Sequence, residues 1–322
     1  AIEKAGFVIN DVLYNVIEGG HHVAMARTAG LTALEFANTL HRMNPDIVLI
    51  RGDRFEQLAL AMSAAYLNKT IAHIEGGDLS GTIDESVRHA ITKLSHIHFV
   101  TNEDSRKRVI QMGEHPESVY NVGSLDIEFT SSVPVKNKGE VVNKTGVGAH
   151  IDVAKPFFVV MQHPVTTEKN NQQHTEELFK VIDEVKMPTV WFCPNSDAGT
   201  HEIAKVIRVW RERAGSENHH IRFVTDLLPE DFIGLLRGAK CLIGNSSSGI
   251  KECSYLGTPV VNIGTRQQNR LRGQNVIDAG YGKEEIKRAI VQQLEHGNYV
   301  VSPIYYQPDT SSRIAKILAN TK

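Results

Sequence analysis

Three carboxylates are the first residues whose type and placement could do chemistry. Asp53 and Glu75 each follow an apolar segment directly, in DIVLIRGD and TIAHIEGG, and Asp84 comes nine residues after Glu75. Such strands would place Asp53 and Glu75 at the carboxyl edge of a sheet, where the three acids can converge on one cleft. Carboxylates held together in a partly dry site cannot all ionise freely. We therefore expect one pKa to rise and supply a general acid beside a general base.

Each of these acids also has a structural interpretation. Asp53 could cap a helix beginning at Arg54, and Asp84 a helix beginning near Glu85. At Asp84, capping and catalysis are compatible. Glu75 is followed by two glycines, which permit positive φ and close approach of the backbone. That geometry is more useful around a ligand than at a simple strand end.

A turn suited to phosphate lies in CLIGNSSSGIKEC. An apolar strand ends at Gly244, a small polar turn follows, and a helix begins, so free backbone N–H groups and the positive end of the helix dipole meet there. The hydroxyls of Ser246 and Ser247 add donors, and Glu252, one turn into the helix, is placed to bind a ribose diol. The alternative is an ordinary Asn or Ser N-cap, with Glu252 on the solvated helix surface.

One histidine is placed to act with these groups. His163 ends the apolar segment FFVVMQHP, on the cleft side of the second half of the chain and opposite the carboxylates. An imidazole there could bind phosphate or exchange protons near neutral pH, and a buried structural histidine is the alternative. His96 and His98 alternate along a strand without a third ligand, which indicates structural residues and no metal pair.

Two series of alternating strands and helices must position these residues. Apolar residues at helical spacing separate short segments rich in β-branched residues, and this alternation predicts parallel sheets covered on both faces. The predicted strands are 8–16, 46–53, 70–77 and 96–102 in the first series, and 157–164, 188–195, 221–226, 241–247 and 259–264 in the second. The predicted helices include 31–43, 55–68, 84–95, 105–113, 175–185, 204–214 and 230–239.

The polar stretch 131–146 divides the two series. It predicts an N-terminal domain over 1–133, which carries the carboxylates, and a C-terminal domain over 134–308, which carries the phosphate turn. Residues 309–322 hold a last helix that we expect to pack back on the first domain. Open α/β sheets bind ligands at the carboxyl ends of their strands, so we expect the site between the two domains.

Composition excludes several classes of function. The 322 residues carry 35 Lys and Arg against 37 Asp and Glu, and this net charge of −2 supplies no basic field for nucleic acid. No apolar run approaches the roughly 18 residues that cross a bilayer. The three cysteines show no CxxC spacing, so we expect neither a disulfide framework nor a zinc site, and a reducing cytoplasm fits best. The opening AIEKAGFVIN predicts a helix end running into a strand, as after an N-terminal truncation.

Six motifs, in order, resemble those of the hydrolysing UDP-N-acetylglucosamine 2-epimerases. This group includes bacterial sialic-acid pathway enzymes and the epimerase half of the bifunctional animal epimerase/kinase. The resemblance covers nearly the whole chain and implies an α/β fold of two Rossmann-like domains of the GT-B type, with the active site in the inter-domain cleft. The motifs are RGDRFEQLALA, HIEGGDLSGTIDESVRHAITKLSHIHF, QHPVTTE, PNSDAG, GNSSSGIKE and GTPVVNIGTRQQNRLRGQNV.

The resemblance also implies a reaction, from UDP-GlcNAc and water to UDP and N-acetylmannosamine, without metal or redox cofactor. It implies a homodimer or homotetramer. The family opens with a strand and a Gly-x-Arg-x-Asp turn that are not in this sequence. The implied catalytic residues are Asp53, Glu75, Asp84 and His163, and the implied substrate or UDP contacts are Arg88, Asn195, Ser246, Ser247, Glu252 and Arg266.

Three alternatives stay open at this point. A non-hydrolysing epimerase would return UDP to the intermediate, but that branch should show a VEAGLR-like segment where this chain has IEGGDLSG. A related hydrolysing enzyme would act on a UDP-2,4-diacetamido sugar for legionaminic acid. A nucleotide-sugar-binding regulator without turnover is the third.

Overall fold

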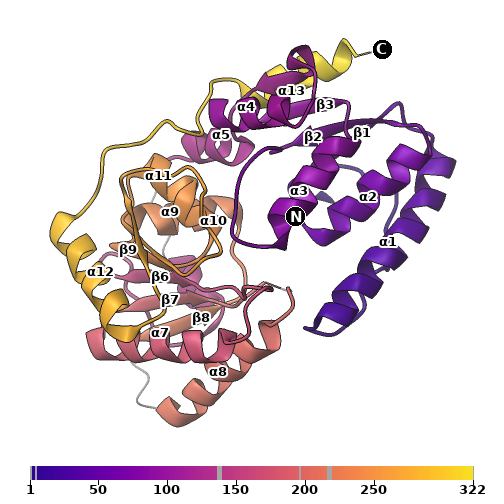
Figure 1. Cartoon of the computed structure of the whole chain (residues 1–322). Coiled ribbons are helices and arrows are strands. Elements are labelled where there is room, and N and C mark those ends of the chain that lie inside the picture. Colours follow the sequence, from indigo (N-terminus) through magenta and orange to yellow (C-terminus); the bar gives the residue numbers. More distant parts are fainter. Residues whose placement is uncertain (1, 4–5, 136–139, 196, 216–219, 322) are drawn as a thin grey trace. The chain divides into compact units, whose positions relative to one another are not determined.

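The chain folds into two compact units. The computed structural model describes residues 2–3, 6–135, 140–195, 197–215 and 220–321. Unit 1 comprises Ala1–Gly77 and Asp84–Tyr120, and unit 2 comprises Asp78–Ile83 and Asn121–Lys322 (Figure 1).

Unit 1 is a parallel sheet with helices between its strands, as the alternating pattern predicts. The sheet has the order β1-β2-β3-β4, and β1 pairs with β2, and β2 with β3, in parallel. Aliphatic side chains of the helices and strands form its core. The elements are α1 (His22–Met43), β1 (Ile47–Arg51), α2 (Phe55–Tyr66), β2 (Thr70–Ile74), α3 (Ile83–Leu94), β3 (Ile97–Val100), α4 (Glu103–Gln111) and β4 (Val119–Asn121).

The strand predicted over 8–16 is wrong. These residues carry no regular structure, and Val8 and Tyr14 are 80% and 92% exposed. The polar groups of this segment bond to helix α1 and not to a neighbouring strand. The Asp11 carboxylate accepts hydrogen bonds from Thr39 and Arg42 at 2.6 Å each. A strand needs backbone partners along its length, and here side chains of a helix take their place.

Unit 2 has a seven-stranded sheet of order β11-β10-β9-β6-β7-β8-β5, in which only the β5–β8 pair is antiparallel among the described pairings. The five predicted strands are confirmed, and β5 and β11 are additional. The strands are β5 (Val147–Gly148), β6 (Phe158–Met161), β7 (Thr189–Phe192), β8 (Ile221–Val224), β9 (Cys241–Gly244), β10 (Val260–Ile263) and β11 (Val276–Ala279). The helices are α5 (Leu125–Ser132), α6 (Glu140–Lys144), α7 (Asn171–Val185), α8 (Thr200–Ala214), α9 (Pro229–Gly238), α10 (Ser247–Ile250), α11 (Glu252–Leu256), α12 (Lys283–His296) and α13 (Thr310–Ala319).

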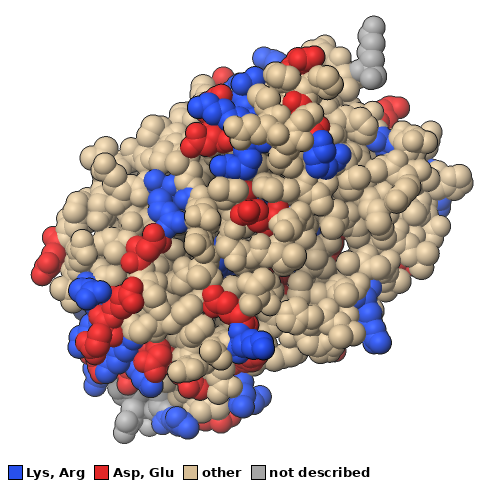
Figure 2. Space-filling model, in the orientation of Figure 1, with Lys and Arg blue, Asp and Glu red and all other residues tan. Residues whose placement is uncertain are grey.

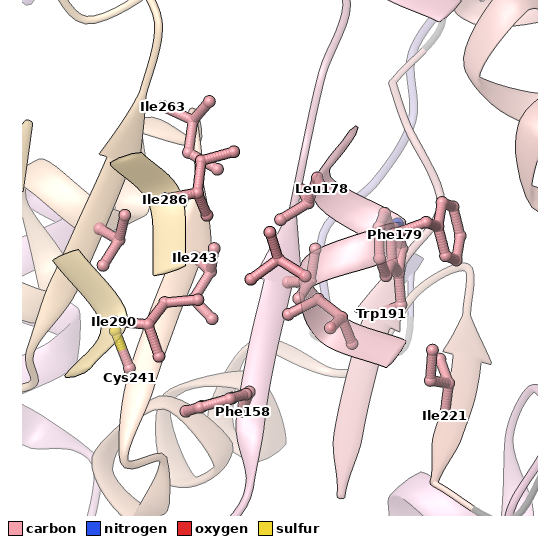
Figure 3. Close-up of a cluster of buried hydrophobic side chains, with 14 of the residues drawn as sticks. Phe158, Leu178, Phe179, Trp191, Ile221, Cys241, Ile243, Ile263, Ile286 and Ile290 are labelled. Carbon is pink, nitrogen blue, oxygen red and sulfur yellow. The ribbon is translucent and has the colours of Figure 1, made fainter. Parts of the chain in front are cut away.

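Apolar side chains cover both faces of this sheet. On one face Phe158, Trp191 and Ile243 pack against α7, α8 and α12, with the rings of Phe179 and Trp191 stacked at 3.9 Å (Figures 1 and 3). The alternate strand residues form a second cluster with α9 and α11 on the other face. Strands buried on both faces make a rigid support for groups at their carboxyl ends.

The contacts divide the chain after Tyr120, whereas the predicted first domain ends at residue 133. Helix α5 packs on α11 and α13, so it belongs to unit 2. Helix α13 packs on α5. The sequence places α5 at the end of the predicted first domain, whereas the contacts place it in unit 2. Part of the predicted connecting stretch, residues 136–139, lies outside the described residues. The limits at 133 and 308 stay predictions.

Two surface properties bear on function. None of the described helices combines the length and apolar character that crossing a bilayer requires. On the face drawn in Figure 2, acidic and basic side chains of the described residues are mixed, and no broad basic surface appears.

Candidate functional site

Asp53 is held by a buried cation. Helix α2 begins at Phe55, one residue later than expected, with Arg54 at its N-cap and Asp53 directly before it. The Asp53 carboxylate accepts a hydrogen bond from the guanidinium of Arg88, whose side chain is only 1% exposed. A buried guanidinium requires an anionic or polar partner. Asp53 and Arg88, both predicted site residues, therefore act as one pair.

A buried histidine links this pair to the strand ends. His73 of β2 lies 3.0 Å from the Gly52 carbonyl through Nε2 and 3.2 Å from the Thr92 hydroxyl through Nδ1. A carbonyl can only accept, so Nε2 carries the proton and Nδ1 accepts from Thr92. Burial lowers the pKa of His73 to about 4, which keeps the ring neutral. The spacing of His73 in the sequence does not reveal this role, because it depends on the pairing of β1 with β2.

Glu75 sits in a forced backbone conformation at the end of β2. Its φ of +71° lies in the left-handed region, and its N–H donates to the Phe99 carbonyl at 2.8 Å. At Gly77 a Cβ would meet the Ser105 carbonyl oxygen at 2.5 Å, so the turn needs this glycine. The Glu75 carboxylate lies 3.3 Å from the Arg51 guanidinium. A strained backbone conformation that the surrounding contacts hold in place is typical of functional sites.

Helix α3 begins at Ile83, near the predicted start at Glu85, and Asp84 lies inside its first turn. A carboxylate there is favoured by the positive end of the helix dipole. Its spacing of four residues places it on the same helix face as Arg88. Arg51 of β1 lies opposite Ile74 of β2, so Asp53 and Glu75 leave neighbouring strands at one sheet edge. The expected rise of one carboxylate pKa stays a prediction.

In unit 2, Asn245 ties together the ends of two paired strands. It is fully buried after β9, and its side chain accepts from the His163 N–H at 2.7 Å and donates to the His163 carbonyl at 2.8 Å. Its own carbonyl accepts from Arg266 at 3.2 Å and from Gln267 at 2.9 Å. The sequence marks Asn245 only as part of the turn. Its bracketing of His163 depends on the pairing of β6 with β9.

The His163 ring is a neutral hydrogen-bond donor. The Asn195 N–H donates to its Nδ1 at 3.2 Å, so the proton lies on Nε2. Burial and the nearby Arg266 charge lower the pKa of His163 to about 3. Of the two predicted roles, this favours donation to a phosphate over proton exchange near neutral pH.

After β9 the structure has two short helices where the sequence predicts one. Ser246 is the N-cap of α10, and its hydroxyl accepts from the Ser248 N–H at 3.3 Å. The predicted single helix is interrupted at Lys251, which leaves α10 with four residues. So short a helix has a small dipole, and anion binding here would depend more on hydroxyl and backbone donors. The Ser248 hydroxyl reaches the Glu252 carboxylate at 3.4 Å.

A pocket of about 460 Å³ in unit 2 brings several of these residues together. His163, Asn195, Ser248 and Glu252 form part of its polar lining, whereas Ser246, Ser247 and Arg266 are not among the lining residues. Apolar lining comes partly from Phe192 and Phe232, whose rings pack edge to face at 5.5 Å. A mostly apolar pocket with a few directed polar groups is typical of a small-molecule site. Within the described part of the chain, no three His, Cys, Asp or Glu side chains gather as metal ligands would.

The fold and these two groups of residues define a class of α/β protein with a ligand site at the carboxyl ends of parallel strands. The family model described as UDP-N-acetylglucosamine 2-epimerase matches residues 1–319, so the chain belongs to this family.

Two relatives and one solved structure illustrate the similarity. The chain is 34% identical over 300 residues to a UDP-N-acetylglucosamine 2-epimerase of Neisseria meningitidis, covering 92% of this chain and 77% of the relative. It is 33% identical over 318 residues to a hydrolyzing UDP-N,N'-diacetylbacillosamine 2-epimerase of Legionella pneumophila, covering 98% and 82%. The Methanocaldococcus jannaschii UDP-GlcNAc 2-epimerase, in complex with UDP-GlcNAc and UDP, superposes with a TM-score of 0.80 at 17% identity, covering 99% and 87%. The predicted two-part α/β fold of the GT-B type is confirmed.

Proposed function

We propose that this chain is a hydrolysing UDP-GlcNAc 2-epimerase, which converts UDP-GlcNAc and water into N-acetylmannosamine and UDP. The observation that carries the proposal is the pocket of unit 2, where a neutral His163 donor and the Glu252 carboxylate line one cavity. The relative from Neisseria meningitidis is named as a UDP-N-acetylglucosamine 2-epimerase, and the relative from Legionella pneumophila is named as hydrolyzing. Asp53, Glu75 and Asp84 of unit 1 supply the acids that the reaction needs.

In the proposed complex, the pocket holds the UDP group. The Glu252 carboxylate accepts hydrogen bonds from the ribose hydroxyls, which are neutral donors. His163 Nε2–H, which belongs to the pocket lining, donates to the diphosphate. The hydroxyls of Ser246 and Ser247 and the Arg266 guanidinium lie outside that lining, and we propose that they contact the part of the diphosphate that extends beyond the pocket. The rings of Phe192 and Phe232, which line the pocket, offer apolar surface to the planar base in this complex.

In the proposed mechanism, the carboxylates of unit 1 act on the sugar. C2–H is not acidic in the ground state, so its removal is coupled to departure of UDP from C1 as positive charge develops there. One carboxylate removes the C2 proton and gives a 2-acetamidoglucal. Water then adds at C1, while another acid returns a proton to the opposite face of C2. Arg88 and His73 keep the Asp53 segment in place during these steps.

A second substrate is favoured by a specific observation. The Legionella pneumophila relative, which matches 98% of this chain, is named as acting on UDP-N,N'-diacetylbacillosamine. The same elimination and hydration would apply to such a sugar. An assay of UDP release from each of the two sugars distinguishes between them.

The test measures release of free UDP from each nucleotide sugar. We expect UDP and N-acetylmannosamine from UDP-GlcNAc, with deuterium at C2 when the reaction runs in D2O. In water labelled with oxygen-18, early samples should carry the label at C1 of the sugar. Label in UDP would mean attack at phosphorus, and UDP-N-acetylmannosamine without free UDP would mean a non-hydrolysing enzyme. Binding of UDP without any turnover would support the regulator.

We also propose that the enzyme is a homo-oligomer. Met62, Tyr66 and Leu67, at the end of α2, are exposed apolar residues of unit 1. Such clusters are often covered in an assembly. Light scattering at micromolar concentration should give a mass above that of one chain, and a monomeric mass would contradict the proposal.

A further inference from the structure

Residues 78–83 connect Glu75 to Asp84, two acids of unit 1, but they pack within unit 2. The chain leaves unit 1 after Gly77, two residues beyond Glu75, and re-enters it at Asp84. Between these points, Asp78–Ile83 make their contacts in unit 2. A segment of six residues can span only about 20 Å when fully extended. The backbone on either side of Glu75 and Asp84 is therefore tethered to a short loop anchored in unit 2.

The first anchor is a buried group of charges. Oδ2 of Asp78 lies 3.9 Å from Nζ of Lys251 and 4.0 Å from Nη2 of Arg270, and the three side chains are 3%, 5% and 8% exposed. Lys251 also lies over the Tyr305 ring, 5.7 Å from its centroid. One anion between two buried cations is a strong constraint, because removing it leaves like charges together in a poorly solvated place.

The second anchor is a contact between two backbones. The Gly81 N–H donates to the Arg266 carbonyl at 3.1 Å. A Cβ on Gly81 would come within 1.8 Å of the Thr265 carbonyl oxygen, so only glycine fits this approach. Both anchors end beside the UDP pocket. Lys251 directly precedes Glu252, which lines the pocket, and the Arg266 side chain donates to the Asn245 carbonyl.

We propose that Asp78 is a positioning residue that couples the UDP pocket to the placement of Glu75 and Asp84. The inference rests on the proposed function. Asp78 touches no substrate in this scheme. A ligand that orders the turn at 246–252 also orders Lys251, and Asp78 transmits this order to the loop. The acids then hold their reactive geometry only while the loop is anchored, and an error of about 1 Å in such a geometry can cost ~10²-fold in rate.

The test compares hydrogen exchange and kinetics of Asp78→Asn with those of the full-length parent protein. With UDP, the parent should show slowed exchange in peptides covering 246–252 and also 75–90. Asp78→Asn should bind UDP within about threefold of the parent and keep the protection of 246–252. It should lose the protection of 75–90, and its kcat should fall at least ~10²-fold with little change in KM.

Two further variants make the result decisive. Gly81→Ala breaks the backbone anchor while leaving the three charges in place, so it should reproduce the loss even if Asp78→Asn folds poorly. Glu114→Gln removes a carboxylate that pairs with Lys93 and with His98, at 3.3 Å, inside unit 1. This control should lower stability without uncoupling 75–90 from UDP.

Either of two results would overturn the inference. In the first, UDP still slows hydrogen exchange at 75–90 in both Asp78→Asn and Gly81→Ala, and both variants keep the kcat of the parent. In the second, Asp78→Asn no longer binds UDP, which would make Asp78 a ligand contact. A parent protein in which UDP slows no exchange at 246–252 would instead refute the proposed UDP site. The two failures are thus distinguishable.

Discussion

The two candidate sites differ in the interactions that build them. In unit 2, His163 is fixed by neutral groups, namely the Asn245 side chain and the Asn195 N–H. In unit 1, the acids are paired with cations, Asp53 with Arg88 and Glu75 with Arg51. Neutral donors in fixed positions suit recognition of a diphosphate, which accepts hydrogen bonds without taking up a proton. Charged groups in adjustable pairs suit proton transfer, because their environment sets their pKa values.

The supporting strands differ in the same sense. All four residues of β9, which precedes Asn245, are buried, whereas burial alternates along β1, which precedes Asp53. Leu49 and the segment around Tyr14 add exposed apolar surface to unit 1. The binding site therefore follows a strand buried on both faces. Asp53 follows a partly exposed strand, and Arg88 and, through the Gly52 carbonyl, His73 hold it in place. Substitutions in the two sites test this difference between the units directly.

The largest effect is expected at the acids. Asp53→Asn and Glu75→Gln should each lower kcat by at least ~10²-fold, the usual scale for losing a general acid or base, and leave UDP affinity unchanged. Calorimetric titration with UDP and a UDP-release assay measure the two quantities. Glu56→Gln, which removes a carboxylate paired with Arg54 in α2, is the control and should keep turnover. If both acid variants stay active, the carboxylates are structural.

A smaller effect is expected from protonation of His73. Its folded-state pKa of about 4 lies below the ordinary value of 6.5, so the unfolded chain binds the proton first as the pH falls. Stability is then full above pH 6.5 and should decline by up to about 1.4 kcal/mol per pH unit from this group until pH 4. His73→Gln keeps an N–H for the Gly52 carbonyl but cannot titrate. Urea unfolding at pH 7, 6 and 5 should show a shallower decline in this variant, and equal slopes would contradict the burial argument.

The sequence predicts the secondary structure of the two units better than it predicts the contacts that hold the site residues in place. The strand predicted over 157–164 begins with five consecutive apolar residues and needs no partner to be recognised. The segment 8–16 also has the composition of a strand, but it bonds to α1. Asp53 and His163 could be placed because each directly follows an apolar run. The bonding of Asn245 to His163, and the packing of Asp78 in unit 2, depend on which strands and loops become neighbours. Local spacing carries no information about that.

A third prediction tests the binding side of the comparison. Glu252→Ala should weaken UDP binding by about 1–3 kcal/mol, the loss of a charge-assisted hydrogen bond to the ribose. UDP should also raise the melting temperature of the parent protein far more than uridine does, because the diphosphate contributes most of the affinity. Both are measured by calorimetric titration and thermal unfolding. An unchanged affinity in Glu252→Ala would leave Glu252 as a helix surface residue.

The smallest effects separate capping from ligand binding within the turn. Ser246 is the N-cap of α10, so Ser246→Ala should lower the free energy of unfolding by about 1 kcal/mol, the usual cost of losing a cap. Ser247, the first residue of α10, is half-buried and has no capping role, so Ser247→Ala should leave stability unchanged and weaken UDP binding by about 0.5–1.5 kcal/mol, one hydrogen bond. Chemical denaturation and calorimetric titration of both variants give the two numbers. If Ser247→Ala binds UDP as tightly as the parent, the diphosphate contacts lie elsewhere, and the turn serves unit 2 only as a helix cap beside His163.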